Sequence, residues 1–190
     1  MKKFIILLGA AMLILPSACA SAGKKAAPEE KTAKKLTYSE KLEKRIHILI
    51  NAERKKYGLK PLKYSKKLQK IAEAHSKDMA KRNYVSHVTP EGLDPTARAK
   101  KAEYNVEKLE GNRIRVGVGE NIFEAYAAME ENGKVTPYLE PLEDASKKIV
   151  KKWMQSPPHK KNIIDKNYTL TGIGVAVSKD KKVKITQLFF

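Results

Sequence analysis

Apolar residues recur at helical spacing in three stretches of this 190-residue chain. In each stretch the apolar side chains fall at positions i, i+3, i+4 and i+7, which is the pattern of an amphipathic helix. Ser39 and Ser65 are placed to cap the starts of the first two helices, and Gly58 follows the first helix as a stop. The pattern predicts helices over about 39–57, from Ser65 through Met79, and over about 142–154.

Strand-forming residues occupy other parts of the chain. Residues 115–126 mix β-branched side chains with glycines, which predicts a strand that bends. Two runs at the end, 171–178 and 182–190, are expected to pair as a hairpin through the segment KDKK. Before the first of these strands the sequence predicts a short helix over about 95–104, and after it a loop over 127–141. This order predicts an α+β domain in which helices cover a small, mainly antiparallel sheet.

The first 22 residues have the features of an export signal. Lys2 and Lys3 form a positive start, and the 12-residue apolar run Phe4–Leu15 precedes the small residues of PSACASA. A helix that spans a bilayer needs about 20 apolar residues, so this run is too short to remain as a membrane helix. We expect residues 1–22 to be a signal peptide and the protein to be extracytoplasmic, with no other membrane segment.

The chain has one cysteine, Cys19, and it lies inside this signal. Cleavage after Ala22 would remove the cysteine and release a secreted protein. The segment LPSAC also resembles a lipobox, in which the cysteine carries a lipid that anchors the protein to the membrane. In both alternatives the folded domain has no thiol and no disulfide. Residues 23–38 lack apolar periodicity, so we expect a solvated tether before a domain at 39–190.

The formal net charge of the chain is +18, and lysines scattered along the sequence supply most of it. Scattered charge favours loose attraction to polyanionic surfaces, so anionic membranes and cell-wall polymers are the partners expected from charge. The sequence has no zinc-finger spacing, no aromatic platform for single strands and no glycine-rich phosphate loop. Specific binding of nucleic acid is therefore not expected.

Two of the four histidines fit the predicted helices as structural residues. His47 lies beside the apolar stripe of the first helix, and His75 lies on the apolar face of the second, where a hydrogen-bonded core histidine is the ordinary interpretation. His87 and His159 lie in predicted loops, where binding and catalytic residues are common. His159 follows two prolines that begin a turn, for which Ser156 is the expected N-cap.

Two glutamates extend this pair of loop histidines. Glu91 follows His87 by four residues in a turn with proline and glycine, and Glu120 lies in GVGEN, where glycines let the backbone bend. Here the chain strongly resembles the CAP superfamily (cysteine-rich secretory proteins, antigen 5 and pathogenesis-related proteins), above all its bacterial SCP-like extracellular branch. The matching motifs cover about residues 40–190 in family order: LINAERKKYGLKPLKYSKKLQKIAEAHSKDMA, SHVTPEG, GVGENIF, VKKWMQSPPHKKNII, YTLTGIGVAV and ITQLFF.

The resemblance implies a three-layer α-β-α sandwich with one cleft, lined by His87, Glu91, Glu120 and His159. Two imidazoles and two carboxylates suit zinc or another divalent cation, and the resemblance implies that these four residues could hold one. The same groups could form a metal-free network of histidine–carboxylate pairs instead. They are also the candidates for acid–base catalysis, although neither Ser86 nor Ser156 lies in a nucleophile-elbow pattern.

Three kinds of function remain open at this point. The first is an exported CAP-domain binding module of the cell envelope or exterior, whose cleft takes a divalent metal, a lipid or another small ligand. The second is a metal-assisted or His–Glu hydrolase that acts on peptides or cell-wall polymers. The third is a structural envelope protein with a vestigial cleft. Because no nucleophile accompanies the four residues, the sequence favours the binding module over the enzyme.

Overall fold

The computed structural model describes residues 36–126, 129–131, 134–136, 141–180 and 182–190. The expected signal peptide at 1–22, Cys19 within it and nearly all of the expected tether lie outside these residues. In the part of the chain that is described, no helix is both long and apolar enough to cross a membrane.

A four-stranded sheet forms the centre of the domain, in the order β1-β7-β8-β4. The short edge strand β1 runs parallel to β7, whereas β7–β8 and β8–β4 are antiparallel pairs. The hairpin predicted at the end of the chain is confirmed, with Val175 opposite Ile185 in its register. The strands span Lys63–Tyr64 (β1), Gly119–Tyr126 (β4), Leu170–Val177 (β7) and Lys182–Phe189 (β8).

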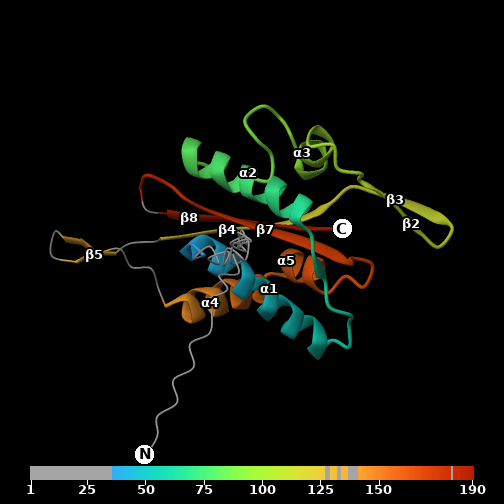
Figure 1. Ribbon diagram of the computed structural model, residues 1–190, viewed down its shortest axis with the longest axis horizontal. Coiled ribbons are helices and arrows are strands. Elements are labelled where there is room, and N and C mark those ends of the chain that lie inside the picture. Colours follow the sequence, from blue (N-terminus) through green and yellow to red (C-terminus); the bar gives the residue numbers. More distant parts are fainter. Residues whose placement is uncertain (1–35, 127–128, 132–133, 137–140, 181) are drawn as a thin grey trace, which may run out of the picture. The chain divides into compact units, whose positions relative to one another are not determined.

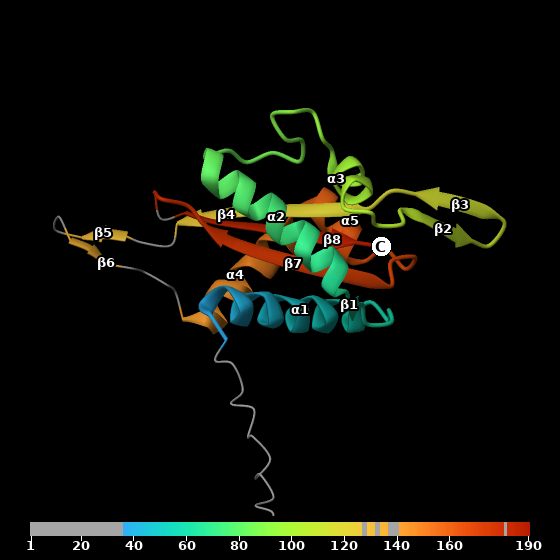
Figure 2. The same cartoon turned by 45° about the horizontal axis from the view of Figure 1, so that its top comes forward.

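Helices cover both faces of this sheet, so the three-layer α-β-α sandwich is confirmed (Figures 1 and 2). On one face, α1 and α4 pack together against the sheet around the fully buried Trp153. On the other face, α2 lies along β7 and β8, and α3 packs beside it through the buried Ala99. The helices span Tyr38–Lys56 (α1), Lys66–Arg82 (α2), Pro95–Lys101 (α3), Leu142–Gln155 (α4) and Pro157–Ile163 (α5).

Two glycines of β7 let α2 approach the sheet closely. A Cβ added at Gly172 or Gly174 would lie well inside contact distance of the backbone of Gln69 or Glu73 on α2. Any larger residue would therefore force the helix away from the sheet. Gly172 and Gly174 thus determine how close α2 lies to the sheet. The loop that carries His87 follows α2 in the chain.

One predicted N-cap and one predicted strand are wrong. The first helix begins at Tyr38, and Thr37 is its N-cap in a capping box with Glu40, so Ser39 already lies inside the helix. The single bent strand predicted over 115–126 is two strands, β3 and β4, because Gly117 between them has a φ of 111°.

Two hairpins were missed by the sequence pattern. The strand β3 (Arg113–Val116) pairs with β2 (Glu107–Glu110) in antiparallel register. The region 127–141, predicted as a loop, contains the short antiparallel pair β5 (Met129–Glu131) and β6 (Lys134–Thr136). Strands of three or four residues carry too few alternating positions to be recognised from hydropathy alone.

A buried carboxylate joins α1 to the free edge of β7. Beyond the two residues of β1, that edge would leave backbone N–H groups unpaired, and Glu43 accepts the N–H of Val175 at 3.1 Å. Glu43 is 5% exposed. Burial raises the pKa of Glu43 from 4.5 to about 7, and the neighbouring charge of Glu73 acts in the same direction.

We expect this group to make the stability of the fold depend on pH. Between pH 4.5 and pH 7 the folded protein holds a proton at Glu43 that the unfolded chain releases, so this contribution to stability is lost as the pH rises. The slope reaches at most about 1.4 kcal/mol per pH unit. Glu43→Gln keeps an acceptor for Val175 and should remove the slope in urea unfolding measured from pH 5 to pH 8. Parallel pH profiles for the wild type and this variant would contradict the assignment. Glu53→Gln, which removes a carboxylate that pairs with Lys56 on the same helix, is the control.

Candidate functional site

The candidate site is built over Glu120, on the edge strand β4. As a whole residue Glu120 is 7% exposed, and its side chain is 1% exposed. The backbone carbonyl of Glu120 accepts a hydrogen bond from Asn162 Nδ2 at 3.0 Å, which ties β4 to α5. A carboxylate this deeply buried is stable only when charged or hydrogen-bonding groups compensate it.

Arg98 supplies the compensating charge, and it comes from α3. Asp94 caps this helix by accepting the Ala97 N–H at 2.7 Å, and Pro95 occupies its first turn. One terminal nitrogen of Arg98 pairs with Glu120 Oε2. The other donates to the carbonyls of His87, at 2.6 Å, and Leu93, at 3.0 Å. One guanidinium therefore neutralises the carboxylate and also holds the loop that carries His87.

His87 completes this network from the loop after α2. Its Nδ1 lies 2.8 Å from Glu120 Oε1. With a carboxylate oxygen as the acceptor, Nδ1 carries the proton and donates it. Its side chain is 48% exposed. No hydrogen bond to Nε2 is found within the described part of the chain, so this nitrogen is available to a molecule that enters from solvent.

His75 holds the same loop through a hydrogen bond. The sequence analysis expected it to be a hydrogen-bonded core histidine. It lies on α2, is 2% exposed, and its Nε2 donates to the carbonyl of Ser86 at 3.0 Å. Burial lowers the pKa of His75, and the positive charge of Arg98 acts in the same direction. The Tyr84 ring packs edge-on against this imidazole, and its hydroxyl donates to Asp78. His75 is thus a positioning residue for His87.

His159 lies on α5, the short helix after α4. The carbonyl of His159 accepts a hydrogen bond from Asn121 Nδ2 at 3.1 Å, and Asn121 is in turn bonded to Asn162. These amides connect α5 to the strand that carries Glu120. Burial lowers the pKa of His159, and the charge of the nearby His87 lowers it further. Both effects favour the neutral imidazole.

Glu91 does not join the other three predicted residues. Its side chain is 59% exposed and pairs with Arg82 at the end of α2, with one N–O distance of 3.0 Å. Arg82 also pairs with Asp78 one turn earlier on the helix. The hydrogen bond from Arg82 lowers the pKa of Glu91 to about 2. The structure therefore pairs His87 with Glu120 and places His159 near His87, and it directs Glu91 to a separate ion-pair cluster.

Comparison with known proteins identifies the family. The sequence model of the CAP family, the cysteine-rich secretory protein family, matches residues 47–190. The chain belongs to the CAP family.

Proteins of bacteria are similar to this CAP domain. YkwD of Bacillus subtilis is 35% identical over 136 residues, which cover 72% of this chain and 43% of YkwD. The chain spans less than half the length of the curated relatives that it matches. An extracellular SCP-domain protein of Bacillus anthracis superposes with a TM-score of 0.56 at 25% identity, covering 83% of this chain and 45% of that protein.

A second solved structure supports the same fold. An outer surface protein from Borrelia burgdorferi superposes with a TM-score of 0.60 at 19% identity, covering 81% of this chain and 94% of that protein. The structural neighbours of this CAP domain thus include extracellular and outer surface proteins of bacteria.

The side chains of this CAP domain, as arranged, do not fit a divalent metal. Among the described residues, no three His, Cys, Asp or Glu side chains lie together as a ligand group. Glu91 pairs with Arg82, and the guanidinium of Arg98 already neutralises Glu120. A cation beside Glu120 would meet the positive charge of Arg98 at close range. Metal binding by the four residues therefore stays a prediction of the family resemblance.

Arg98 is the site residue that the sequence analysis missed. It is the one arginine of a short helix otherwise rich in lysine, and it follows a clear helix start at Asp94 and Pro95. A buried glutamate needs a cationic or hydrogen-bonding partner, but sequence spacing alone did not indicate which basic side chain would reach it.

Loss of Arg98 should leave Glu120 buried and uncompensated. We expect Arg98→Ala to lower the free energy of unfolding by about 3–5 kcal/mol, since removal of one partner of a buried ion pair costs this much. Denaturant unfolding measures the effect.

The double variant Arg98→Ala/Glu120→Gln tests the cause. It should be more stable than Arg98→Ala alone, because no buried charge remains. Arg45→Ala, which breaks a partly exposed pair with Glu143, is the matched control and should change stability little. If the double variant is less stable than Arg98→Ala, the charge-compensation account of Glu120 is wrong.

Proposed function

We propose that this chain is an extracytoplasmic CAP-domain binding module, and that its cleft binds a small polar ligand through the imidazoles of His87 and His159. The proposal keeps the binding function that the sequence favoured and replaces the metal by a hydrogen-bonding ligand. Export rests on the signal at residues 1–22, which lies outside the described residues, and on the extracellular and outer surface neighbours.

The observation that carries the proposal is the complete pairing of the Glu120 carboxylate. One of its oxygens pairs with Arg98 and the other accepts from His87 Nδ1, so its charge is already compensated. Nε2 of His87 and the neutral imidazole of His159 remain to face a ligand. Imidazole nitrogens can donate or accept, so a ligand with hydroxyl or amide groups suits them. Because Arg98, Glu120 and His75 hold His87 in place beforehand, little ordering is needed on binding.

A second candidate function has one specific observation in its favour. The His87–Glu120 pair at 2.8 Å has the arrangement of a base and the carboxylate that orients it, with Nε2 free. The adjacent Ser86 hydroxyl accepts the Val88 N–H at 3.1 Å, so the structure ties it to its own loop. A hydrolase built on this pair would therefore have to activate water. This requirement places the hydrolase second.

Wall-derived muropeptides test both candidates, because they carry hydroxyl, amide and peptide groups. In the full chain with labelled histidines, we expect saturable NMR shifts of the His87 and His159 ring resonances as muropeptides are added. Mass spectrometry of the same samples should show intact muropeptides. His87→Ala and His159→Ala should each reduce the affinity at least about tenfold, which corresponds to about 1.4 kcal/mol. His47→Ala removes a histidine outside the cleft and is the control.

Two results would change the assignment. Cleavage of muropeptides by the wild type, with its loss in Glu120→Gln, would establish the hydrolase instead. Binding that survives both cleft substitutions unchanged would show that this cleft does not bind the probe.

A further inference from the structure

A concave surface is formed by segments that carry none of the candidate site residues. A groove of about 680 Å³ runs between the segment after α1 and the segment before β7. We call it the Arg54 groove and define its walls as residues 58–63 and 166–170. Three lysines line it, Lys60, Lys63 and Lys166, and no acidic residue does.

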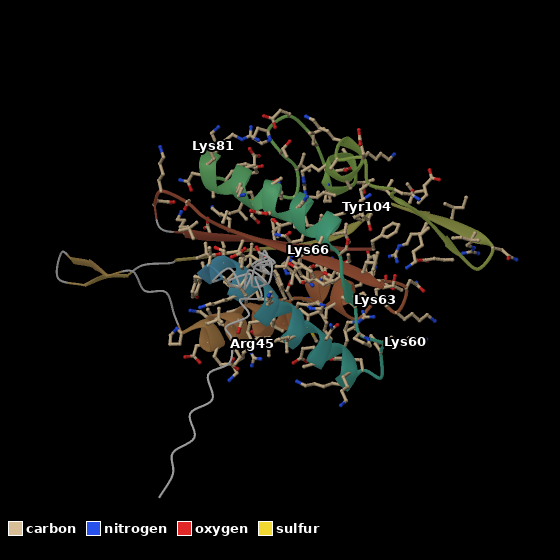
Figure 3. All side chains as sticks on the ribbon, in the orientation of Figure 1. Arg45, Lys60, Lys63, Lys66, Lys81 and Tyr104 are labelled. Atoms are coloured by element: carbon tan, nitrogen blue, oxygen red, sulfur yellow. The ribbon has the colours of Figure 1, made fainter. Side chains whose placement is uncertain are left out.

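The three lysines are free to meet a ligand. All three are exposed, and none of them makes an ion pair within the described ranges of the chain. Figure 3 shows Lys60 and Lys63 following one another along the segment that joins α1 to α2, with Lys66 continuing the series at the start of α2. The acidic residue that directly precedes the second wall, Asp165, is already paired with Arg115 at 2.9 Å.

A buried arginine fixes both walls of this groove. Arg54 on α1 is 1% exposed, and it donates to the carbonyl of Lys60 on one side at 2.9 Å. On the other side it donates to the carbonyls of Ile163, Asp165 and Tyr168, at 2.7, 2.9 and 3.3 Å. Carbonyls orient a guanidinium but do not cancel its charge. Arg54 therefore makes the groove rigid and adds positive potential beneath it.

The shape and chemistry of the groove select its partner. A flat bilayer surface cannot enter a concave groove, whereas a single extended chain can. Lysine ammonium groups act as compact point charges that suit phosphate. The aromatic residue in the lining, Tyr168, is 7% exposed, so no face is offered for the stacking of bases. We propose that the Arg54 groove binds a linear polymer that carries phosphate groups along its backbone.

This site goes beyond the proposed function of the cleft and does not depend on it. The groove is lined by none of the residues that contact Glu120, and its ligand is a polyanion rather than a small polar molecule. The net charge predicted an attraction to anionic wall polymers, and the Arg54 groove is the place on the surface where we propose that they bind. His87→Ala should leave polymer binding unchanged, so the two proposals can fail separately.

Calorimetric titration of the full chain with a linear polyphosphate tests the groove. The triple variant Lys60→Gln/Lys63→Gln/Lys166→Gln should bind at least about tenfold more weakly than the wild type. The slope of log K against the logarithm of the salt concentration should also be smaller in magnitude by about 2 for this variant. Each lost phosphate contact removes about 0.7 from that slope. The control triple Lys41→Gln/Lys100→Gln/Lys151→Gln removes the same charge from exposed positions elsewhere and should lose less than about threefold.

Three outcomes would overturn the proposal. The first is an equal loss of affinity in the two triple variants, which would show attraction by net charge alone. The second is no binding of polyphosphate by the wild type. The third is binding to phosphatidylglycerol vesicles that exceeds binding to polyphosphate, which would identify a membrane surface as the partner.

Discussion

The candidate site depends on one constraint, the compensation of the buried Glu120 carboxylate. A charge at 1% side-chain exposure cannot remain without partners, and here one guanidinium and one imidazole provide them. Arg98 can reach Glu120 because Asp94 and Pro95 start α3 at the right place. The same guanidinium holds the carbonyl of His87. Arg98 therefore both compensates the charge of Glu120 and helps to position the exposed imidazole of His87.

The fold brings this arrangement together through close packing of α2. Gly172 and Gly174 let the helix lie against the sheet, which places His75 beneath the loop that follows. His75 then holds Ser86, one residue before His87. Asn121 and Asn162 tie α5, which carries His159, to β4. These contacts position the His87 imidazole against the buried carboxylate and connect the helix of His159 to the same strand.

Much of this fold could be predicted from the sequence, because long amphipathic helices and the final hairpin have strong periodic signals. The core role of His75 followed from its place on an apolar helix face. The β2–β3 and β5–β6 hairpins could not be found, because their strands are too short for a pattern. For Glu91, nearness to His87 in the chain suggested a shared site. The end of α2 brings Arg82 to Glu91 instead, and α3 brings Arg98 to Glu120. Which basic side chain meets which carboxylate depends on tertiary packing that spacing does not encode.

The central claim is that Arg98, and not a metal ion, compensates Glu120 in this CAP domain. Crystals grown with a slight excess of zinc, with diffraction data collected at the zinc absorption edge, test it most directly. The account predicts the Arg98 guanidinium against Glu120 and the His87 carbonyl, with no anomalous peak between His87 and His159. A zinc peak bound by His87, Glu120 and His159, with Arg98 displaced from the carboxylate, would contradict it.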